Sequence, residues 1–168
     1  VDRYGPPSLA GESAFDRPFL WGSKRTGPDL ARVGGKYSNE WHTAHLVNPR
    51  SVLPHSIMPT YAFLRDRDLS FGDIAGHLRT LRTVGTPYSD AQIANAAADL
   101  RAQAGEEAWQ QAFRTRYAGG AMGDLDGQPG RITEMDALIA YLQSLGALTD
   151  WSRVPQGTPR ADRREAAR

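Results

Sequence analysis

The chain has 168 residues, of which 40% are hydrophobic and 23% are charged, and its formal net charge is +1. These values are typical of one soluble globular domain and argue against a disordered chain, a membrane bundle or a nucleic-acid-binding protein. The chain contains no cysteine, which excludes disulfides, thiolate metal sites and a cysteine nucleophile in these residues.

Residues 1–37 are rich in glycine and proline, as in Gly5-Pro6-Pro7, Gly27-Pro28 and Gly34-Gly35. Such a composition predicts an irregular loop region rather than a helix or a strand. Aromatic residues, including Trp21 and Tyr37, are interleaved with the glycines and prolines. We therefore expect this region to pack onto another surface instead of forming a flexible linker.

Four helix starts follow, each marked by a capping side chain or by apolar spacing. Ser38 precedes a helix over residues 39–48 that Pro49 ends. Ser70, with Asp73 three residues later, predicts a second helix with Phe71, Ile74, Ala75, Leu78 and Leu81 on one face. Ser89 with Gln92 predicts a third, with Ile93, Ala97 and Leu100 on its apolar face and Gly105 after its end. Residues 106–117 follow as a fourth.

The last predicted helix has the clearest pattern. Thr133 and Asp136 form a capping pair, and the apolar stripe that follows consists of Met135, Leu138, Ile139, Leu142 and Leu145, before Gly146. No segment shows sustained alternation of apolar and polar residues, so we predict an all-α domain with long loops over residues 1–148. Residues 149–168 mix arginines with prolines, which predicts a disordered basic tail.

Two histidines, His42 and His45, lie three residues apart on the first predicted helix and so share a face. With His55 as a third ligand they would suit zinc or iron. The pattern lacks the glutamate of the His-Glu-x-x-His helix, however, and surface or hydrogen-bonded histidines are the more common outcome.

Met58 lies in a loop bounded by Pro54 and Pro59. A methionine is most often a filler of core gaps. A thioether on a loop stiffened by proline also suits an axial ligand of haem iron, because such a ligand needs a fixed reach.

Two further motifs are more simply interpreted as turns than as ligand-binding loops. The segment from Gly27 to Tyr37 lacks the Gly-Lys-Ser/Thr ending of a phosphate loop. Asp124 and Asp126 could bind calcium, but the run is too short for a twelve-residue calcium loop and lacks its closing glutamate. A polar turn is the favoured interpretation.

Three segments together resemble the mono-haem c-type cytochrome subunit (subunit II) of cbb3-type terminal oxidases. They are residues 21–38, with the sequence WGSKRTGPDLARVGGKYS, residues 48–59, with NPRSV and IMP, and residues 124–136, which begin with DLDGQPGR. The resemblance covers residues 1–148, and the first segment is its most specific part. It implies a class I cytochrome c-like domain with a helical insertion over residues 69–122.

The resemblance also implies roles for individual residues. The carbonyl of Pro28 would accept a hydrogen bond from the proximal histidine, and Leu30 would pack on the haem. Met58 would be the distal ligand of the iron. Lys36 and Tyr37 would lie near the haem propionates. Trp21 and Trp41 would be aromatic residues at the haem edge or in the core.

The sequence departs from this family at its beginning. The family carries a Cys-x-x-Cys-His segment, and a membrane anchor before it, upstream of the position matched by Val1. Neither pattern occurs in this chain, which opens with Val1 and contains no apolar run near the roughly 20 residues that span a bilayer. We therefore expect a C-terminal part of the subunit that lacks the haem-attachment helix, with haem c bound in the complete protein.

The function implied by the resemblance is electron transfer through one haem c to the catalytic subunit of the oxidase. Its expected partners are the catalytic and di-haem cytochrome subunits, at the periplasmic face of the bacterial inner membrane, and nucleic acid is not among them. One alternative is a structural or assembly module of the oxidase without its own redox centre. Another is a metal enzyme that uses His42, His45 and His55.

Overall fold

A computed structural model describes residues 8, 14–15, 27–105 and 107–147 of the chain. Within these residues there are seven helices and no strand, apart from one isolated antiparallel bridge between Asp68 and Thr133. This confirms the predicted all-α class. None of the helices in the described part is long and apolar enough to cross a bilayer. Trp21 and the predicted basic tail, residues 149–168, lie outside the described residues.

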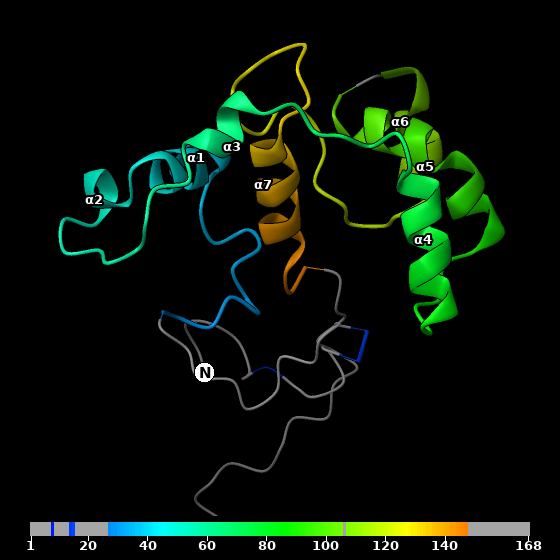
Figure 1. Ribbon diagram of the computed structural model, residues 1–168, viewed down its shortest axis with the longest axis horizontal. Coiled ribbons are helices and arrows are strands. Elements are labelled where there is room, and N and C mark those ends of the chain that lie inside the picture. The colour runs from blue at the N-terminus through cyan, green and yellow to red at the C-terminus, as the bar shows by residue number, and fades with distance from the viewer. Residues whose placement is uncertain (1–7, 9–13, 16–26, 106, 148–168) are drawn as a thin grey trace, which may run out of the picture.

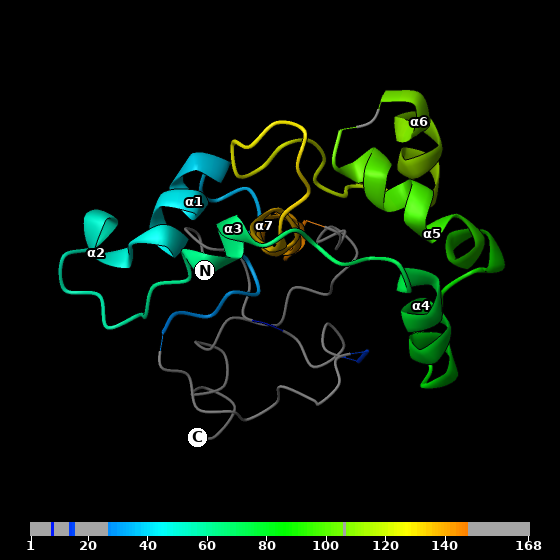
Figure 2. The same cartoon turned by 45° about the horizontal axis from the view of Figure 1, so that its top comes forward.

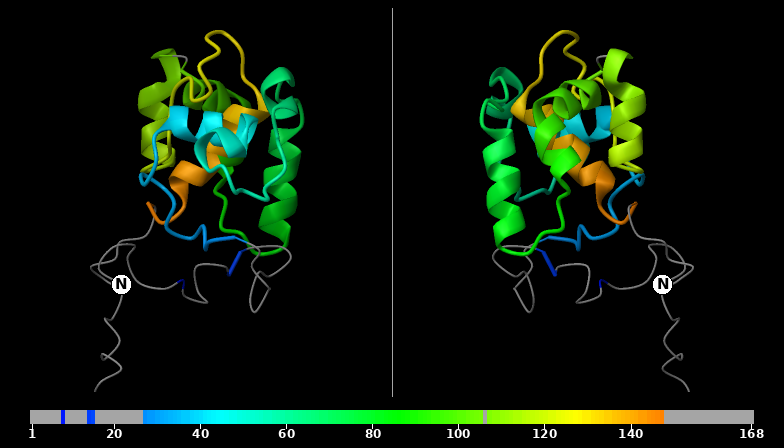
Figure 3. Two further views of the ribbon diagram at one scale, coloured as in Figure 1. Left: turned by 90° about the vertical axis from the view of Figure 1, so that its left-hand side faces the viewer. Right: turned by 90° about the vertical axis from the view of Figure 1, so that its right-hand side faces the viewer.

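The last helix, α7 (Glu134–Ser144), stands between two groups of helices (Figure 1). On one side lie three helices: α1 (Asn39–Val47), α2 (Pro49–Val52) and α3 (Phe63–Asp66). On the other side lies the helical insertion: α4 (Ile74–Thr83), α5 (Asp90–Gln103) and α6 (Glu107–Arg116). Figure 2 views α7 nearly end-on and shows the same division. In the left-hand view of Figure 3, α7 (orange) crosses behind α1 (cyan), and the right-hand view shows the opposite side.

Each group of helices has its own small core. Leu46 of α1 meets Leu125, Met135 and Ile139, and the last two side chains are fully buried. Leu78, Ile93 and Ala96 form a second cluster inside the insertion. A cleft of about 280 Å³ separates α5 from α7 and is lined by apolar residues of both helices. The insertion is therefore a separately packed unit beside α7.

Three of the predicted helix starts are confirmed by their capping bonds. The Ser38 hydroxyl accepts a hydrogen bond from the Trp41 amide, and Ser89 forms a capping box with Gln92. Thr133 and Asp136 form a second capping box at the start of α7. The side-chain oxygens satisfy amides that have no partner within the helix, so each start is determined locally.

The predicted start at Ser70 is wrong. The chain first makes a turn in which the Ile74 amide donates to the Phe71 carbonyl at 3.2 Å, and α4 begins only after Asp73. The short helices α2 and α3 were not predicted, and α2 follows Pro49 directly with the Asn48 side chain as its cap. Pro49 therefore ends one helix and begins the next, as its fixed φ allows.

The predicted apolar face of α5 is also corrected. Its buried residues are Ile93, Ala96, Asp99 and Ala102, whereas Ala97 and Leu100 are only half-buried. The helix is rotated so that a carboxylate faces inward. Asp99 is buried because Arg116 of α6 meets it with two donor nitrogens, and the Nε–Oδ2 distance is 2.8 Å. Asp99, in its ion pair with Arg116, therefore lies on the buried face of α5, where Ala97 and Leu100 were expected.

Candidate functional site

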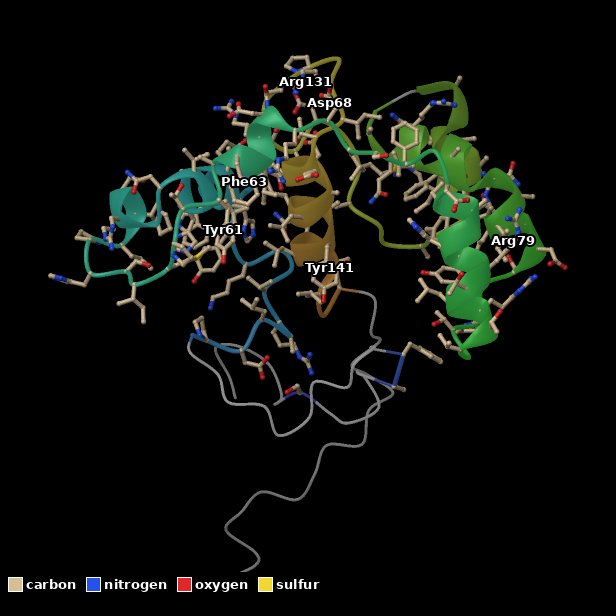
Figure 4. All side chains as sticks on the ribbon, in the orientation of Figure 1. Tyr61, Phe63, Asp68, Arg79, Arg131 and Tyr141 are labelled. Carbon is tan, nitrogen blue, oxygen red and sulfur yellow. The ribbon has the colours of Figure 1, made fainter. Side chains whose placement is uncertain are left out.

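Met58 is held on a segment that is anchored to the end of α1. The Tyr61 amide donates to the Leu46 carbonyl at 2.8 Å, and the Thr60 hydroxyl donates to the Val47 carbonyl at 2.6 Å. The half-buried Met58 side chain packs against the core cluster around Leu46. Figure 4 shows Tyr61 and Phe63, which follow Met58, on the α1 side of α7. The thioether is thus fixed at one place in the fold.

The loop before α1 is built from local turns. The Ala31 amide donates to Asp29 Oδ1 at 3.0 Å, and the Val33 amide donates to the Leu30 carbonyl at 3.0 Å. Pro28 and Leu30 are exposed, Leu30 to 48%. An exposed leucine on an ordered turn is available to cover an apolar surface.

The same loop is locked to the C-terminal end of α7. The Gly34 amide donates to the Leu145 carbonyl at 3.0 Å. A Cβ atom at Gly34 would lie 2.6 Å from that carbonyl oxygen and closer still to the carbonyl oxygen of Gln143. Glycine is therefore required here, because only it lets the two backbones approach so closely.

Three aromatic rings stack along α1 at four-residue spacing. Tyr37 lies on Trp41 with centroids 3.9 Å apart, and Trp41 lies on His45 at 4.7 Å, both with interplanar angles of 13°. The Lys36 ammonium lies 5.1 Å from the Tyr37 ring centroid. The edge of His42 faces Trp41, with centroids 5.5 Å apart. We call these five residues the α1 aromatic cluster.

Both histidines of the α1 aromatic cluster are at least partly buried, and His42 is only 3% exposed. Burial lowers the pKa of His42, and the neighbouring His45 lowers it further; burial alone lowers the pKa of His45. Both rings are therefore neutral at pH 7. Two of their nitrogens, His42 Nε2 and His45 Nδ1, are buried without a hydrogen-bond partner among the described residues.

The residues predicted from the resemblance thus fall into three groups. Lys36, Tyr37 and Trp41 lie together in the α1 aromatic cluster. Met58 lies on the neighbouring anchored segment, whereas Pro28 and Leu30 are on the turn that leads into the cluster. Trp21 lies outside the described residues. The aromatic stacking was not predicted, although the spacing of Tyr37, Trp41 and His45 was visible in the sequence.

The three histidines of the metal-enzyme alternative do not form a three-ligand group in the described part of the chain. His55 is exposed, and the described residues contain only one cluster with metal-ligand spacing: Asp124, Asp126 and Asp136. The sequence pattern identified Asp136 only as the capping partner of Thr133. It did not indicate that the Asp136 carboxylate lies beside those of Asp124 and Asp126.

The oxygens of this acidic cluster accept hydrogen bonds from the protein itself. Asp136 Oδ1 accepts from the Leu125 and Asp126 amides, each at 3.0 Å. Asp124 Oδ1 accepts from the Gly127 and Gln128 amides at 2.7 and 3.0 Å. The carboxylates organise a polar turn and tie it to the start of α7, which is the interpretation that the sequence favoured.

Comparisons with known proteins show to which family the chain belongs. A comparison with curated proteins gives no match. A comparison with protein families matches residues 1–149 to the family described as "Cytochrome C oxidase, mono-heme subunit/FixO". The match covers most of the chain, including the loop before α1, the Met58 segment and α7. The chain belongs to the mono-haem subunit family of cbb3-type cytochrome c oxidases, whose domain is cytochrome c-like.

Proposed function

We propose that this protein is an electron-transfer subunit that relays electrons through one haem c to the catalytic subunit of the oxidase. The observation that carries the proposal is the fixed position of Met58, a thioether anchored against the core within a chain of the mono-haem family. A thioether is one of the ligands that haem iron takes in electron-carrying cytochromes.

The described residues fit a haem group in three ways. Met58 offers a soft axial ligand on an anchored segment. Leu30, Leu53 and Ile57 are exposed apolar side chains close in sequence to the predicted haem contacts, and Ile57 is 79% exposed. The two unpartnered imidazole nitrogens supply buried polar atoms. A flat apolar ring with polar edge groups would satisfy all three features. When bound, haem supplies a one-electron Fe(III)/Fe(II) couple, and methionine ligation raises its potential.

Each predicted site residue then has a role as binder or positioner. Met58 would bind the iron through its thioether, and the Pro28 carbonyl would accept a hydrogen bond from the histidine of the Cys-x-x-Cys-His segment and so orient its ring. Leu30 would cover the haem ring, and Lys36 and Tyr37 would lie near its propionates. Trp41 would lie at the haem edge and exclude water from it, and the same role for Trp21 stays a prediction from the resemblance.

Covalent attachment has a chemical condition. A thioether bond to haem needs a cysteine sulfur, and the 168 residues contain none. The haem is therefore held either through cysteines outside these residues or by non-covalent contacts alone.

The partners follow from the family and from the reaction. An electron carrier needs a donor and an acceptor, and in a cbb3-type oxidase we propose the di-haem cytochrome subunit and the catalytic subunit for these roles. The corresponding location is the periplasmic face of the bacterial inner membrane.

The test replaces Met58 by alanine in the haem-loaded full-length subunit. We expect Met58→Ala to abolish the long-wavelength ligand-to-iron band of the ferric protein, lower the midpoint potential and open a coordination position to added ligands. Met122→Ala is the matched control, because Met122 is another half-buried thioether, in the loop after α6. It should leave the band and the potential unchanged.

Two results would contradict the proposal. A Met58→Ala subunit with an unchanged band and potential would show that Met58 is not the ligand. A complete subunit with no reduced-minus-oxidised haem difference spectrum would favour the structural-module alternative, in which this chain holds oxidase subunits together.

A further inference from the structure

We propose that His42 and His45 are positioning residues that donate hydrogen bonds to the carboxylates of the haem propionates. This inference rests on the proposed function and extends it to two residues for which the family resemblance implied no role. Neither residue is a ligand of the iron in this proposal.

The first argument is the hydrogen-bond inventory of the two rings. A neutral imidazole has one N–H donor and one acceptor nitrogen, and buried polar atoms of proteins are almost always hydrogen-bonded. Yet His42 Nε2 and His45 Nδ1 are both buried without a partner among the described residues. Each of these two atoms, on neighbouring turns of α1, therefore lacks the partner that a buried ring nitrogen usually has.

The second argument is the rigidity of the arrangement. The His45 ring lies parallel to the Trp41 indole at 4.7 Å, and Trp41 lies in turn on Tyr37 at 3.9 Å. The edge of His42 meets both Trp41 and Tyr37, at centroid distances of 5.5 and 6.0 Å. Stacking of this kind restricts ring rotation, so the ring nitrogens have fixed positions before any ligand binds.

The third argument is the balance of donors and acceptors. Besides Lys36, the α1 aromatic cluster contains a phenol, an indole and two imidazoles, all of which can donate a hydrogen bond. Glu40, the acidic residue in the first turn of α1, is exposed and its side chain hydrogen-bonds Ser38 instead. A group of hydrogen-bond donors suits an anionic acceptor. The carboxylate is also a far stronger acceptor than the thioether of Met58.

The test uses the haem-loaded full-length subunit with His42→Leu, His45→Leu and the double substitution. We expect each change to shift the propionate bending frequencies in the resonance Raman spectrum and to lower the midpoint potential. A propionate that loses its donor keeps more negative charge, which favours ferric iron. The double variant should show the larger shift, and His42→Gln and His45→Gln should restore part of it because glutamine still donates.

His77→Leu is the matched control, since His77 is an exposed histidine on α4, in the helical insertion. It should change neither the Raman frequencies nor the potential. Far-ultraviolet circular dichroism of every variant separates a local change from a loss of fold, and the glutamine variants keep the test usable if the leucine variants unfold.

Two outcomes would overturn the inference. Unchanged propionate frequencies in the folded double variant would show that the imidazoles do not contact the carboxylates. Loss of the Met58 ligand band with unchanged propionate frequencies would place the histidines at the sulfur instead. The proposed function would survive both results, because it depends on the Met58→Ala experiment and on the haem difference spectrum.

Discussion

The side chain of Gln143 joins the end of α7 to Gly35, since its Oε1 accepts a hydrogen bond from the Gly35 amide at 2.9 Å across 108 residues of sequence. Its Nε2 donates to the Tyr37 carbonyl at 3.0 Å and to Asn39 Oδ1 at 2.8 Å. One amide group thus connects α7 with the loop that carries Pro28 and Leu30 and with the first turn of α1.

Replacing Gln143 by alanine should therefore destabilise the chain. Three hydrogen bonds are lost, each with a net value of about 0.5–1.5 kcal/mol, so we expect a decrease of about 2 kcal/mol in the free energy of unfolding. Urea unfolding followed by tryptophan fluorescence measures the change. Gln111→Ala, at an exposed position of α6, is the control and should have an effect of less than about 0.5 kcal/mol. Equal effects of the two substitutions would show that Gln143 is not a connecting residue.

Gly34→Ala should be more harmful than its size suggests. The added methyl group would lie 2.6 Å from the Leu145 carbonyl oxygen, so the loop must move away from α7. Overpacking of this kind costs about 1–3 kcal/mol, and we expect a value at the upper end because backbone atoms are on both sides. Gly72→Ala is the control, because a Cβ atom there meets nothing within 4 Å. Thermal melts of both variants would refute the argument if they coincided.

The Asp99–Arg116 ion pair inside the insertion should contribute more to the free energy of unfolding than the exposed Arg82–Asp90 pair. The Asp99 side chain is 4% exposed and Arg116 is 20% exposed, whereas in the Arg82–Asp90 pair Asp90 is 95% exposed. Asp99→Ala removes the buried carboxylate and leaves the partly exposed Arg116 guanidinium without its partner, so we expect a loss of about 3 kcal/mol. Asp90→Ala should cost less than about 1 kcal/mol. Amide hydrogen exchange should accelerate in α5 and α6 of the Asp99 variant while α7 remains protected.

In the absence of haem, acidification should destabilise the domain through the two histidines of α1. Their pKa values in the folded state lie below the ordinary value of 6.5, so below that pH the unfolded chain binds protons more readily than the folded one. The stabilisation is present above pH 6.5 and is lost as the pH falls towards and through the lowered pKa values. Urea midpoints between pH 7.5 and pH 5 measure this slope. His42→Gln with His45→Gln should reduce it, and His77→Gln should leave it unchanged; an equally steep slope in the double variant would exclude the two histidines as its cause.

The parts of the fold that the sequence predicted are those governed by neighbouring residues. Ser38, Ser89 and Thr133 were identified as helix starts because a capping oxygen acts on amides two or three residues away. Ser70 was misidentified although its pattern was similar, since a turn at Phe71 competes with the helix for the same residues. Local patterns of this kind do not reveal which of two local structures is more stable.

The site depended more on distant contacts, and these were harder to predict. Met58 and Tyr37 were named from a family resemblance, but the anchoring of Met58 to Leu46 and Val47 needs the folded chain. Asp99 was not recognised as buried, because its burial depends on Arg116 seventeen residues later. The roles of Gln143 and Asp136 likewise depend on partners far along the chain.

Both ends of the helical insertion meet at Thr133. Its hydroxyl donates to Asp126 Oδ2 at 2.8 Å, while its backbone pairs with Asp68, and Asp68 is also bound by Arg131 at 2.7 Å (Figure 4). The chain therefore leaves for the insertion and returns from it at nearly one point.

Because of this junction, the insertion can change without moving the residues on either side of it. Lengthening, shortening or replacing residues 69–122 leaves the two chain segments of the junction in place, and a closed loop of this kind tolerates changes in length at little entropic cost. The helical insertion can thus be altered, and with it any contacts that it makes, while the methionine segment and the final helix keep their positions.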